Sequence, residues 1–265
     1  MQINQNIRWL IMFAEERQQI ILKKVIENKS ITVKELAELL DVSMPTVRSD
    51  IDIICANYPD IERTHGGIVL SNKFIHQTPY DERKALNLKE KQSIASLAIS
   101  LIKHKDTILI DSSSTSNEIA NKLVNIDIKI TIITTGINIA VKLKENPNLT
   151  VIIIGGVLKP KSNTIQNSFD DSVINAFNID KFFFSASGVS LKNGFSDYNY
   201  NEVVDKKRFL AKCQQSIALI DSTKFNIDSK SSFAQLKEVD YLITTQTVDK
   251  KDIERYKRSI KVLTA

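Results

Sequence analysis

The chain has 265 residues, of which 42% are hydrophobic and 25% are charged, a composition typical of a folded globular protein. Its length is sufficient for two domains. No apolar run approaches the roughly 20 residues that span a membrane. The short stretch 9–13 is followed closely by acidic residues, which argues against a signal peptide. We therefore expect a cytoplasmic protein without a membrane segment.

The net charge of +5 does not by itself indicate a nucleic-acid partner. Residues 1–75 contain nine Lys and Arg residues and ten Asp and Glu residues. The net charge of this part is therefore about −1, and that of the remainder is about +6. Basic residues of the N-terminal part must therefore gather on one face if that part binds DNA. Cys55, Cys213 and the three histidines show no metal-ligand spacing, so we expect neither a metal site nor a cofactor.

The N-terminal part begins with two predicted helices. Apolar residues recur at helical spacing in residues 15–29 and again in residues 31–40, so each segment should turn one face inward. These residues are Ile20, Ile21, Val25 and Ile26 in the first segment, and Val33, Leu36, Ala37 and Leu40 in the second.

A turn and a third helix follow. Ser43 can cap this helix by accepting a backbone N–H, and Pro45 suits its first turn. Val47, Ile51 and Ile54 should point to the core, which leaves the outer side of the helix free to enter a DNA major groove. The pattern fits two ordinary core helices equally well. The outward residues are Ser43, Met44, Thr46, Arg48 and Ser49.

Residues 61–70 favour the DNA-binding interpretation. Their sequence, IERTHGGIVL, predicts two short strands around a Gly-Gly turn, as in the wing of a winged helix. Arg63 and His65 would lie where a wing touches the phosphate backbone.

In residues 15–70 the chain resembles the DeoR family of bacterial sugar-metabolism repressors. The resemblance implies a transcriptional regulator, most simply a repressor, that binds double-stranded operator DNA as a homodimer or homotetramer. Ser49 stands where the family usually carries a second Arg, and either Met1 or Met12 is the native start. The matching motifs are Glu16-Arg17, Val42-Ser43, Thr46-Val47-Arg48, Asp50-Ile51 and Arg63-Thr64-His65-Gly66-Gly67.

Residues 71–89 are polar, contain Pro79 and mix both charge signs, and we interpret them as a linker. From residue 90 to 265, apolar β-branched runs alternate with helical segments. This alternation predicts an α/β domain with a doubly wound, mostly parallel sheet that is covered on both faces. The predicted strands cover residues 107–110, 129–133, 151–154, 181–184, 216–220 and 241–243.

Ligands of such sheets bind at the carboxyl ends of the strands. Residues 111–115, DSSST, follow the first strand and lead into a helix, whose N–H groups, hydroxyls and dipole would favour a bound phosphate. These serines could instead simply cap the helix. Lys224 places a cation after the fifth strand, although it could also be a solvated loop lysine.

This half of the chain resembles the DeoR-type sensor domain, which is similar in fold to ribose-5-phosphate isomerase and glucosamine-6-phosphate isomerase. The resemblance implies a phosphorylated sugar as effector. Ser113 replaces a family glycine, Thr135 replaces an asparagine, and a glycine usual near Asn167 is missing. The candidate effector residues are Asp111, Ser113, Ser114, Thr115, Thr134, Gly155, Gly156, Gly188 and Lys224.

Two other functions stay open beside the effector-controlled regulator. One is an isomerase-like, sugar-phosphate-processing enzyme fused to a DNA-binding domain, and the other is a regulator whose α/β domain only oligomerises. An aldose–ketose isomerase needs a carboxylate base, but the loop 185–190 contains none. Asp197 and Glu202 come later, and Glu202 beside Lys206 suggests a surface ion pair. We therefore expect no enzymatic activity.

Overall fold

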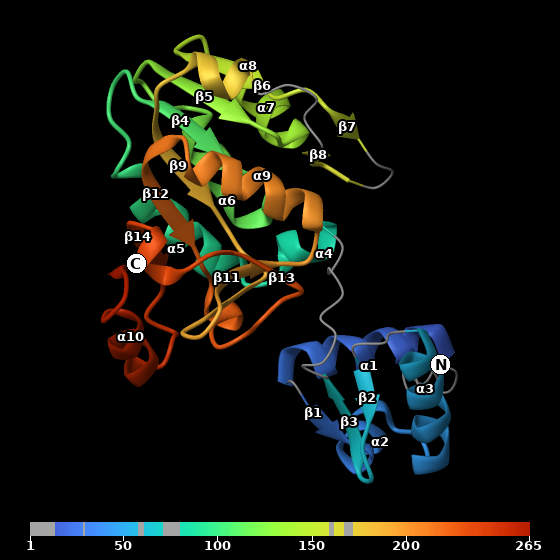
Figure 1. The fold of residues 1–265 in the computed structure, drawn as a ribbon. Helices are drawn as coiled ribbons and strands as arrows, with labels where there is room; N and C mark the ends of the chain where they lie inside the picture. The colour runs from blue at the N-terminus through green and yellow to red at the C-terminus, as the bar shows by residue number, and fades with distance from the viewer. Residues whose placement is uncertain (1–13, 29, 58–60, 71–79, 159–161, 167–171) are drawn as a thin grey trace, which may run out of the picture. The chain divides into compact units, whose positions relative to one another are not determined.

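The structure is a computed structural model that describes residues 14–28, 30–57, 61–70, 80–158, 162–166 and 172–265. The chain divides into two compact units, Met1–His76 and Gln77–Ala265 (Figure 1). Each unit has its own hydrophobic core. The alternative starts Met1 and Met12 lie outside the described residues. Within the described ranges, no helix is long and apolar enough to cross a membrane.

The N-terminal unit combines three helices with a small antiparallel sheet, which confirms the predicted winged helix-turn-helix. The sheet has the order β1-β3-β2, in which β2 and β3 form the predicted wing hairpin and β1 is an additional strand that was not predicted. The elements are α1 (Ala14–Asn28), β1 (Ser30–Thr32), α2 (Val33–Leu40), α3 (Met44–Asn57), β2 (Ile61–Arg63) and β3 (Gly67–Leu70).

The core of this unit forms because each helix turns its apolar face toward the other two. Ile21 and Val25 of α1, Leu36 of α2, and Val47 and Ile51 of α3 are all almost completely buried. Burial of one such side chain contributes roughly 1.5–3 kcal/mol. The helical spacing of these residues therefore determines how the three helices pack.

Polar contacts fix the helix ends. The Thr32 hydroxyl accepts a hydrogen bond from the Glu35 N–H at 3.1 Å, and the Glu35 carboxylate accepts one from the Thr32 N–H at 2.8 Å. This capping box begins α2. The Ser43 hydroxyl accepts a hydrogen bond from the Thr46 N–H at 3.3 Å, as expected for the cap of α3.

The two glycines of the wing have different surroundings. A Cβ atom at Gly67 would lie 2.3 Å from the backbone oxygen of Ile31, where β3 pairs with β1. No atom lies within 4 Å of the corresponding position at Gly66. Close strand pairing therefore requires a glycine at position 67.

The C-terminal unit is built on a seven-stranded sheet with the order β15-β14-β12-β9-β4-β5-β6. All neighbouring strands are parallel, which confirms the predicted α/β class. The edge strand β15 was not predicted. The strands are β4 (Thr107–Ile110), β5 (Ile130–Thr134), β6 (Leu149–Ile153), β9 (Ile179–Phe184), β12 (Cys213–Leu219), β14 (Tyr241–Thr244) and β15 (Lys261–Thr264).

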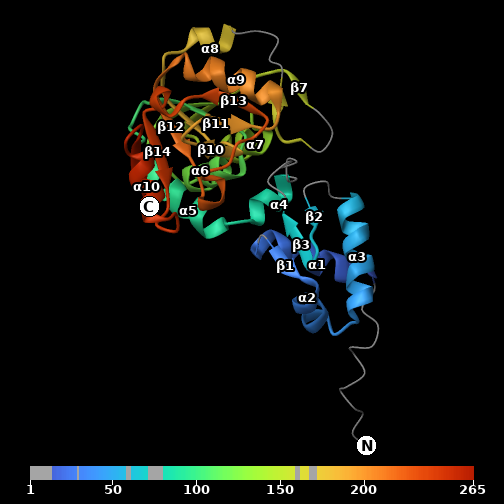
Figure 2. The ribbon, with the colours of Figure 1, turned by 60° about the horizontal axis from the view of Figure 1, so that its bottom comes forward.

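Both faces of this sheet are buried, as the continuous apolar runs predicted. In β9, Phe182 and Phe184 belong to one core cluster and Phe183 to the other. Helices α5, α6 and α7 contribute to the cluster of Phe183, whereas α8, α9 and α10 contribute to the opposite one (Figure 2). These helices are α5 (Leu88–Ile99), α6 (Ser114–Leu123), α7 (Ile137–Leu143), α8 (Ser172–Ala176), α9 (Tyr200–Leu210) and α10 (Lys250–Tyr256).

Two small antiparallel pairings accompany the main sheet. The first is a three-stranded sheet of β10 (Gly188–Ser190), β11 (Gly194–Asp197) and β13 (Ser231–Ala234). The second is the hairpin of β7 (Val157–Leu158) and β8 (Ile165–Gln166). Strand β11 ends at Asp197, so the small sheet delivers a carboxylate to the region beyond β9.

Part of the segment that was predicted as a linker is helical. Residues 80–85 form α4 (Tyr80–Ala85), and residues 88 and 89 already belong to α5. The buried Lys91 ammonium stabilises this arrangement, because it donates to the carbonyls of Arg83 and Leu86. Its burial lowers the pKa of Lys91 to about 8. Residues 71–79 lie outside the described ranges.

Candidate functional site

The N-terminal end of α3 presents the side chains that were predicted to read DNA. Ser43, Met44, Arg48 and Ser49 are exposed, and Thr46 is half-buried. The Ser43 and Thr46 hydroxyls share a hydrogen bond of 2.8 Å. Since Val47 is fully buried, one face of α3 is anchored in the core while the other is free. A recognition helix in a major groove needs this arrangement.

An ion pair that was not predicted joins α3 to α1. The Asp50 carboxylate is buried and accepts hydrogen bonds from Arg17 Nε at 2.8 Å, from Arg17 Nη2 at 3.2 Å and from Gln18 Nε2 at 3.3 Å. Arg17 and Asp50 were noted only as parts of family motifs. Their contact gives them a structural role in orienting the helix that carries Arg48.

The two predicted DNA-contacting residues of the wing differ in their contacts. His65 is exposed at the turn, whose Thr64 N–H donates to the Gly67 carbonyl at 2.9 Å. Arg63 is also exposed, but its guanidinium forms an ion pair with Asp52 of α3. Arg63 thus links the wing to α3, and it must exchange Asp52 for a phosphate if it contacts DNA.

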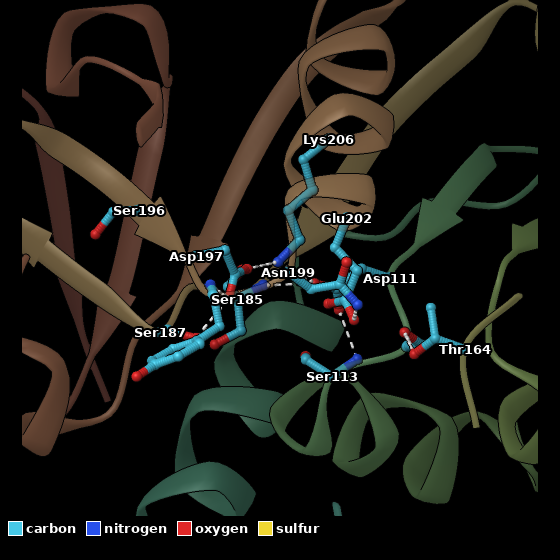
Figure 3. Close-up of polar contacts among 12 residues, drawn as sticks. Asp111, Ser113, Thr164, Ser185, Ser187, Ser196, Asp197, Asn199, Glu202 and Lys206 are labelled. Carbon is cyan, nitrogen blue, oxygen red and sulfur yellow. Dashed lines mark hydrogen bonds and ion pairs between the residues drawn. The ribbon is translucent and has the colours of Figure 1, made fainter. Parts of the chain in front are cut away.

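Asp111 is the centre of a polar cluster at the carboxyl end of the main sheet (Figure 3). It follows β4 and is buried. One carboxylate oxygen accepts from the Ser113 N–H at 3.1 Å and the Ser116 hydroxyl at 2.6 Å. The other accepts from the Ser185 N–H at 3.0 Å. Asp111 therefore connects the loop before α6 to the end of β9.

Lys206 is the buried cation of this cluster, and Figure 3 shows it reaching from α9 toward Asp197. Its ammonium lies 2.5 Å from Asp197 Oδ2, 2.6 Å from the Ser185 carbonyl and 3.3 Å from Asp111 Oδ2. The sequence-based expectation of a surface ion pair is therefore wrong. Lys206 is buried because α9 packs across the sheet and turns this side chain inward.

The charges of this pair stabilise each other. Burial would raise the pKa of Asp197, but the Lys206 ammonium and the hydrogen bond from Ser187 hold it below its usual value. Burial would likewise lower the pKa of Lys206, but Asp197 and Asp111 raise it above the usual range. Asp197 is thus an ionised partner of Lys206 and is not free to act as a base.

Glu202 lies one turn before Lys206 on α9 and is half-buried. Burial, followed by the charge of Asp197, raises the pKa of Glu202 to about 7. Its carboxylate accepts a hydrogen bond of 3.4 Å from Asn199. In the described part of the chain, no cation lies within ion-pair distance of Glu202.

Of the predicted effector residues near α6, Ser113 contacts Asp111. Ser113 caps α6, because its hydroxyl accepts from the Ser116 N–H at 3.1 Å and donates to the Ser116 hydroxyl at 3.0 Å. Ser114 and Thr115 are buried in the first turn of α6. The Thr134 hydroxyl donates to the Ile110 carbonyl at 2.8 Å, so this residue connects β5 to β4.

The remaining predicted residues lie at other strand ends. Gly155 and Gly156 are exposed beyond β6. Gly188 begins β10, and a Cβ atom there would lie 2.4 Å from the Ile227 carbonyl, so backbone packing explains this glycine. Lys224 is half-buried after β12. Among the described residues, no hydrogen bond or ion pair joins Lys224 to Asp111.

Sequence reasoning missed several members of the cluster. Thr164 shares a hydrogen bond of 2.5 Å with the Ser112 hydroxyl, and the Asn201 amide donates to Gln166 at 3.4 Å. Residues 197–206 offered one signal, since they place three carboxylates and a lysine within a short stretch. The cluster residues that were absent from the predicted effector set are Ser112, Thr164, Gln166, Ser185, Ser187, Asp197, Asn199 and Lys206.

Comparisons with known families match both units. Residues 17–74 match the model of the DeoR-like helix-turn-helix domain, and residues 86–246 match that of the DeoR C terminal sensor domain. The chain is 36% identical to the HTH-type transcriptional regulator GolR of Listeria innocua over 90% of this chain and 93% of the relative. It is 30% identical to the HTH-type transcriptional repressor GlcR of Bacillus subtilis over 88% of this chain and 89% of that relative.

Similar solved structures are more distant. Ribose 5 phosphate isomerase A from Neisseria gonorrhoeae aligns with a TM-score of 0.39 and 16% identity, over 57% of this chain and 56% of that chain. The full-length sorbitol operon regulator SorC from Klebsiella pneumoniae aligns with a TM-score of 0.34 and 7% identity, over 79% of this chain and 90% of that chain.

Proposed function

Since the chain belongs to the DeoR family of transcriptional regulators, we propose that it represses a sugar-metabolism operon and that a phosphorylated sugar controls its affinity for operator DNA. The observation that carries this proposal is the combination of an exposed α3 end with a buried polar cluster in the sensor domain. The repressor names of GlcR and of the lactose phosphotransferase system repressor of Lactococcus lactis support it.

Operator DNA would be read by the outer side of α3. Ser43, Met44, Thr46 and Arg48 would contact base edges, with Ser49 beside them, because the helix enters the major groove through its N-terminal residues. Arg63 and His65 would contact the phosphate backbone and fix the register. The exposure of Arg48 and the burial of Val47 support this orientation.

The effector would bind at the carboxyl ends of the sheet. Its phosphate would lie on Ser113, Ser114, Thr115 and Lys224, where the N-terminus of α6 favours an anion. Its hydroxyls would lie near Asp111, Thr134 and Gly188, with Gly155 and Gly156 leaving space for the backbone to approach. The position of Ser114 and Thr115 in the first turn of α6 supports the phosphate end.

Control requires that the effector bind the DNA-competent and incompetent states with different affinities. A coupling free energy of about 1–3 kcal/mol is sufficient for a useful switch. The protein would act in the cytoplasm as a homodimer or homotetramer, since two-fold symmetric regulators bind paired half-sites on DNA.

A gel-shift experiment tests this function. The purified protein is incubated with DNA from upstream of its own gene, excess competitor DNA and four compounds: fructose 6-phosphate, glucose 6-phosphate, ribose 5-phosphate and glyceraldehyde 3-phosphate. We expect specific binding that at least one compound weakens or strengthens. Absence of specific binding would contradict the regulatory function at this DNA.

The same experiment separates the two alternatives. Specific binding that is insensitive to all four compounds, together with an assembled oligomer, would favour an α/β domain that only oligomerises. Chemical conversion of any of the compounds, followed by NMR spectroscopy, would favour the fused enzyme. We do not expect conversion, because the chain belongs to a family of transcriptional regulators and Lys206 already pairs with Asp111 and Asp197.

A further inference from the structure

Glu202 has unfilled hydrogen-bonding capacity at the edge of the polar cluster. A carboxylate can accept about four hydrogen bonds, but among the described residues the side chain of Glu202 receives one long bond, from Asn199. The Lys206 ammonium does not supply the others, because its three donors are directed at Ser185, Asp197 and Asp111. Partial burial without such partners is costly for a carboxylate.

Two carboxylates and two cations surround Glu202. Asp197 comes from the end of β11, Asp111 from the loop after β4, Lys206 from the next turn of α9 and Arg83 from α4, and the charges of all four act on Glu202. Because Lys206 is already shared by two aspartates, the ionised Glu202 carboxylate would itself repel an anion bound against it. A neutral donor, such as a hydroxyl, would be favoured.

We propose that the Glu202 carboxylate is a specificity-determining residue that accepts a hydrogen bond from a hydroxyl group of the bound sugar phosphate. This inference rests on the proposed function, since it assumes that the cluster binds the effector. The phosphate would lie toward the N-terminus of α6 and the hydroxyl-bearing carbon chain toward α9. Glu202 thereby gives the ligand a defined orientation.

A linked proton distinguishes this role from a structural one. A hydroxyl that donates to Glu202 favours the ionised carboxylate, so binding must expel the proton from molecules in which Glu202 is protonated. Since the pKa of Glu202 is raised to about 7, roughly half of the molecules carry that proton at pH 7. Binding should therefore release up to about half a proton per site and strengthen as the pH rises from 6 to 8.

Calorimetric titration of the full chain tests the proposal. The four sugar phosphates named above are titrated at pH 7 in two buffers that differ in ionisation enthalpy, with inorganic phosphate as the probe that lacks hydroxyls. Glu202→Gln should weaken binding of the sugar phosphate by roughly 10- to 100-fold, as expected for a lost bond to a charged group. This variant should also lose the proton release that comes from Glu202. Its affinity for inorganic phosphate should be the same as that of the wild type.

Glu145→Gln serves as the matched control, because Glu145 is exposed and should change neither quantity. A Glu202→Gln protein that binds the sugar phosphate with wild-type affinity, proton release and pH dependence would overturn the inference while leaving the proposed function intact. If none of the four compounds binds the wild-type protein, the effector part of the proposed function fails, and this inference fails with it.

Discussion

Arg17 of α1 and Asp50 of α3 form a two-pronged ion pair across 33 residues of the chain, with Nε–Oδ2 and Nη2–Oδ1 distances of 2.8 and 3.2 Å. The Asp50 side chain is only 3% exposed. This pair fixes the rotation of α3 around its own axis, and it thereby determines which side chains of α3 face outward.

Replacement of Arg17 should destabilise the N-terminal unit strongly. Arg17→Ala leaves the buried Asp50 carboxylate without its cation, which costs roughly 3–5 kcal/mol. Denaturant unfolding of the full chain, followed by circular dichroism, measures this loss. The double variant Arg17→Ala with Asp50→Ala should recover part of it, since no buried charge then remains. Equal stability of the single and double variants would contradict this explanation.

Arg48→Ala should weaken specific DNA binding without changing the fold. Arg48 is exposed on α3, and a bidentate contact between Arg and guanine contributes roughly 1–3 kcal/mol of discrimination. Specific affinity should therefore fall by roughly 5- to 150-fold in a gel shift with competitor DNA. Arg255→Ala, at an exposed residue of α10, is the control. Wild-type selectivity in Arg48→Ala would remove this residue from base recognition.

Lys206→Met should destabilise the C-terminal unit by roughly 3–5 kcal/mol, because Asp111 and Asp197 would remain buried without a cation. Thermal unfolding measures the effect. Addition of Asp197→Asn should restore part of the stability, because it removes one of the two uncompensated carboxylates. If the single Lys206→Met variant unfolds like the wild type, the ion-pair cluster has no structural importance.

The stability of the C-terminal unit should decrease between pH 5 and pH 8. The pKa of Glu202 in the folded chain is raised to about 7, above its ordinary value of 4.5, so the folded state binds the proton more tightly. The resulting stability is complete below pH 4.5 and is lost as the pH rises through 7. Melting temperatures across this range should fall in the wild type.

Glu202→Gln should flatten this pH profile. A smaller slope near pH 6 should persist, because burial also raises the pKa of Asp205 to about 6, and Asp205→Asn should remove that part. A wild-type profile that rises steadily from pH 5 to pH 8 would contradict the environment assigned to Glu202.

Lys224→Ala should reduce the response to the effector. If Lys224 binds the phosphate, the variant will need a higher concentration of the active sugar phosphate to change the gel shift, while its DNA affinity without ligand stays the same. Lys212→Ala, at an exposed residue before β12, is the matched control. An unchanged effector concentration would show that the phosphate lies elsewhere.

The regular part of the fold was predictable because hydrophobic periodicity controls it. Continuous apolar, β-branched runs located β4, β5, β6, β9, β12 and β14, and a cap at Ser43 located the start of α3. Strand β15 was missed because half of its residues are polar or exposed at the sheet edge, and β1 was missed because a three-residue strand has no detectable period.

The polar cluster was less predictable than the strands. Asp111 was identified because it directly follows a strand. Lys206 was not, since its burial depends on how α9 packs across the sheet, and its sequence neighbours Lys207 and Arg208 indicated a solvated face. Contacts such as Asp111 with Ser185 join residues 74 positions apart, and no local pattern contains that information.

The contrast between Gly66 and Gly67 determines which sequences this wing can accept. An alanine at position 66 would meet open space, whereas an alanine at position 67 would meet the Ile31 carbonyl. A library of single substitutions, selected for DNA binding, should therefore recover varied residues at position 66 and glycine at position 67. Two adjacent, identical letters in the chain thus have very different tolerance to mutation.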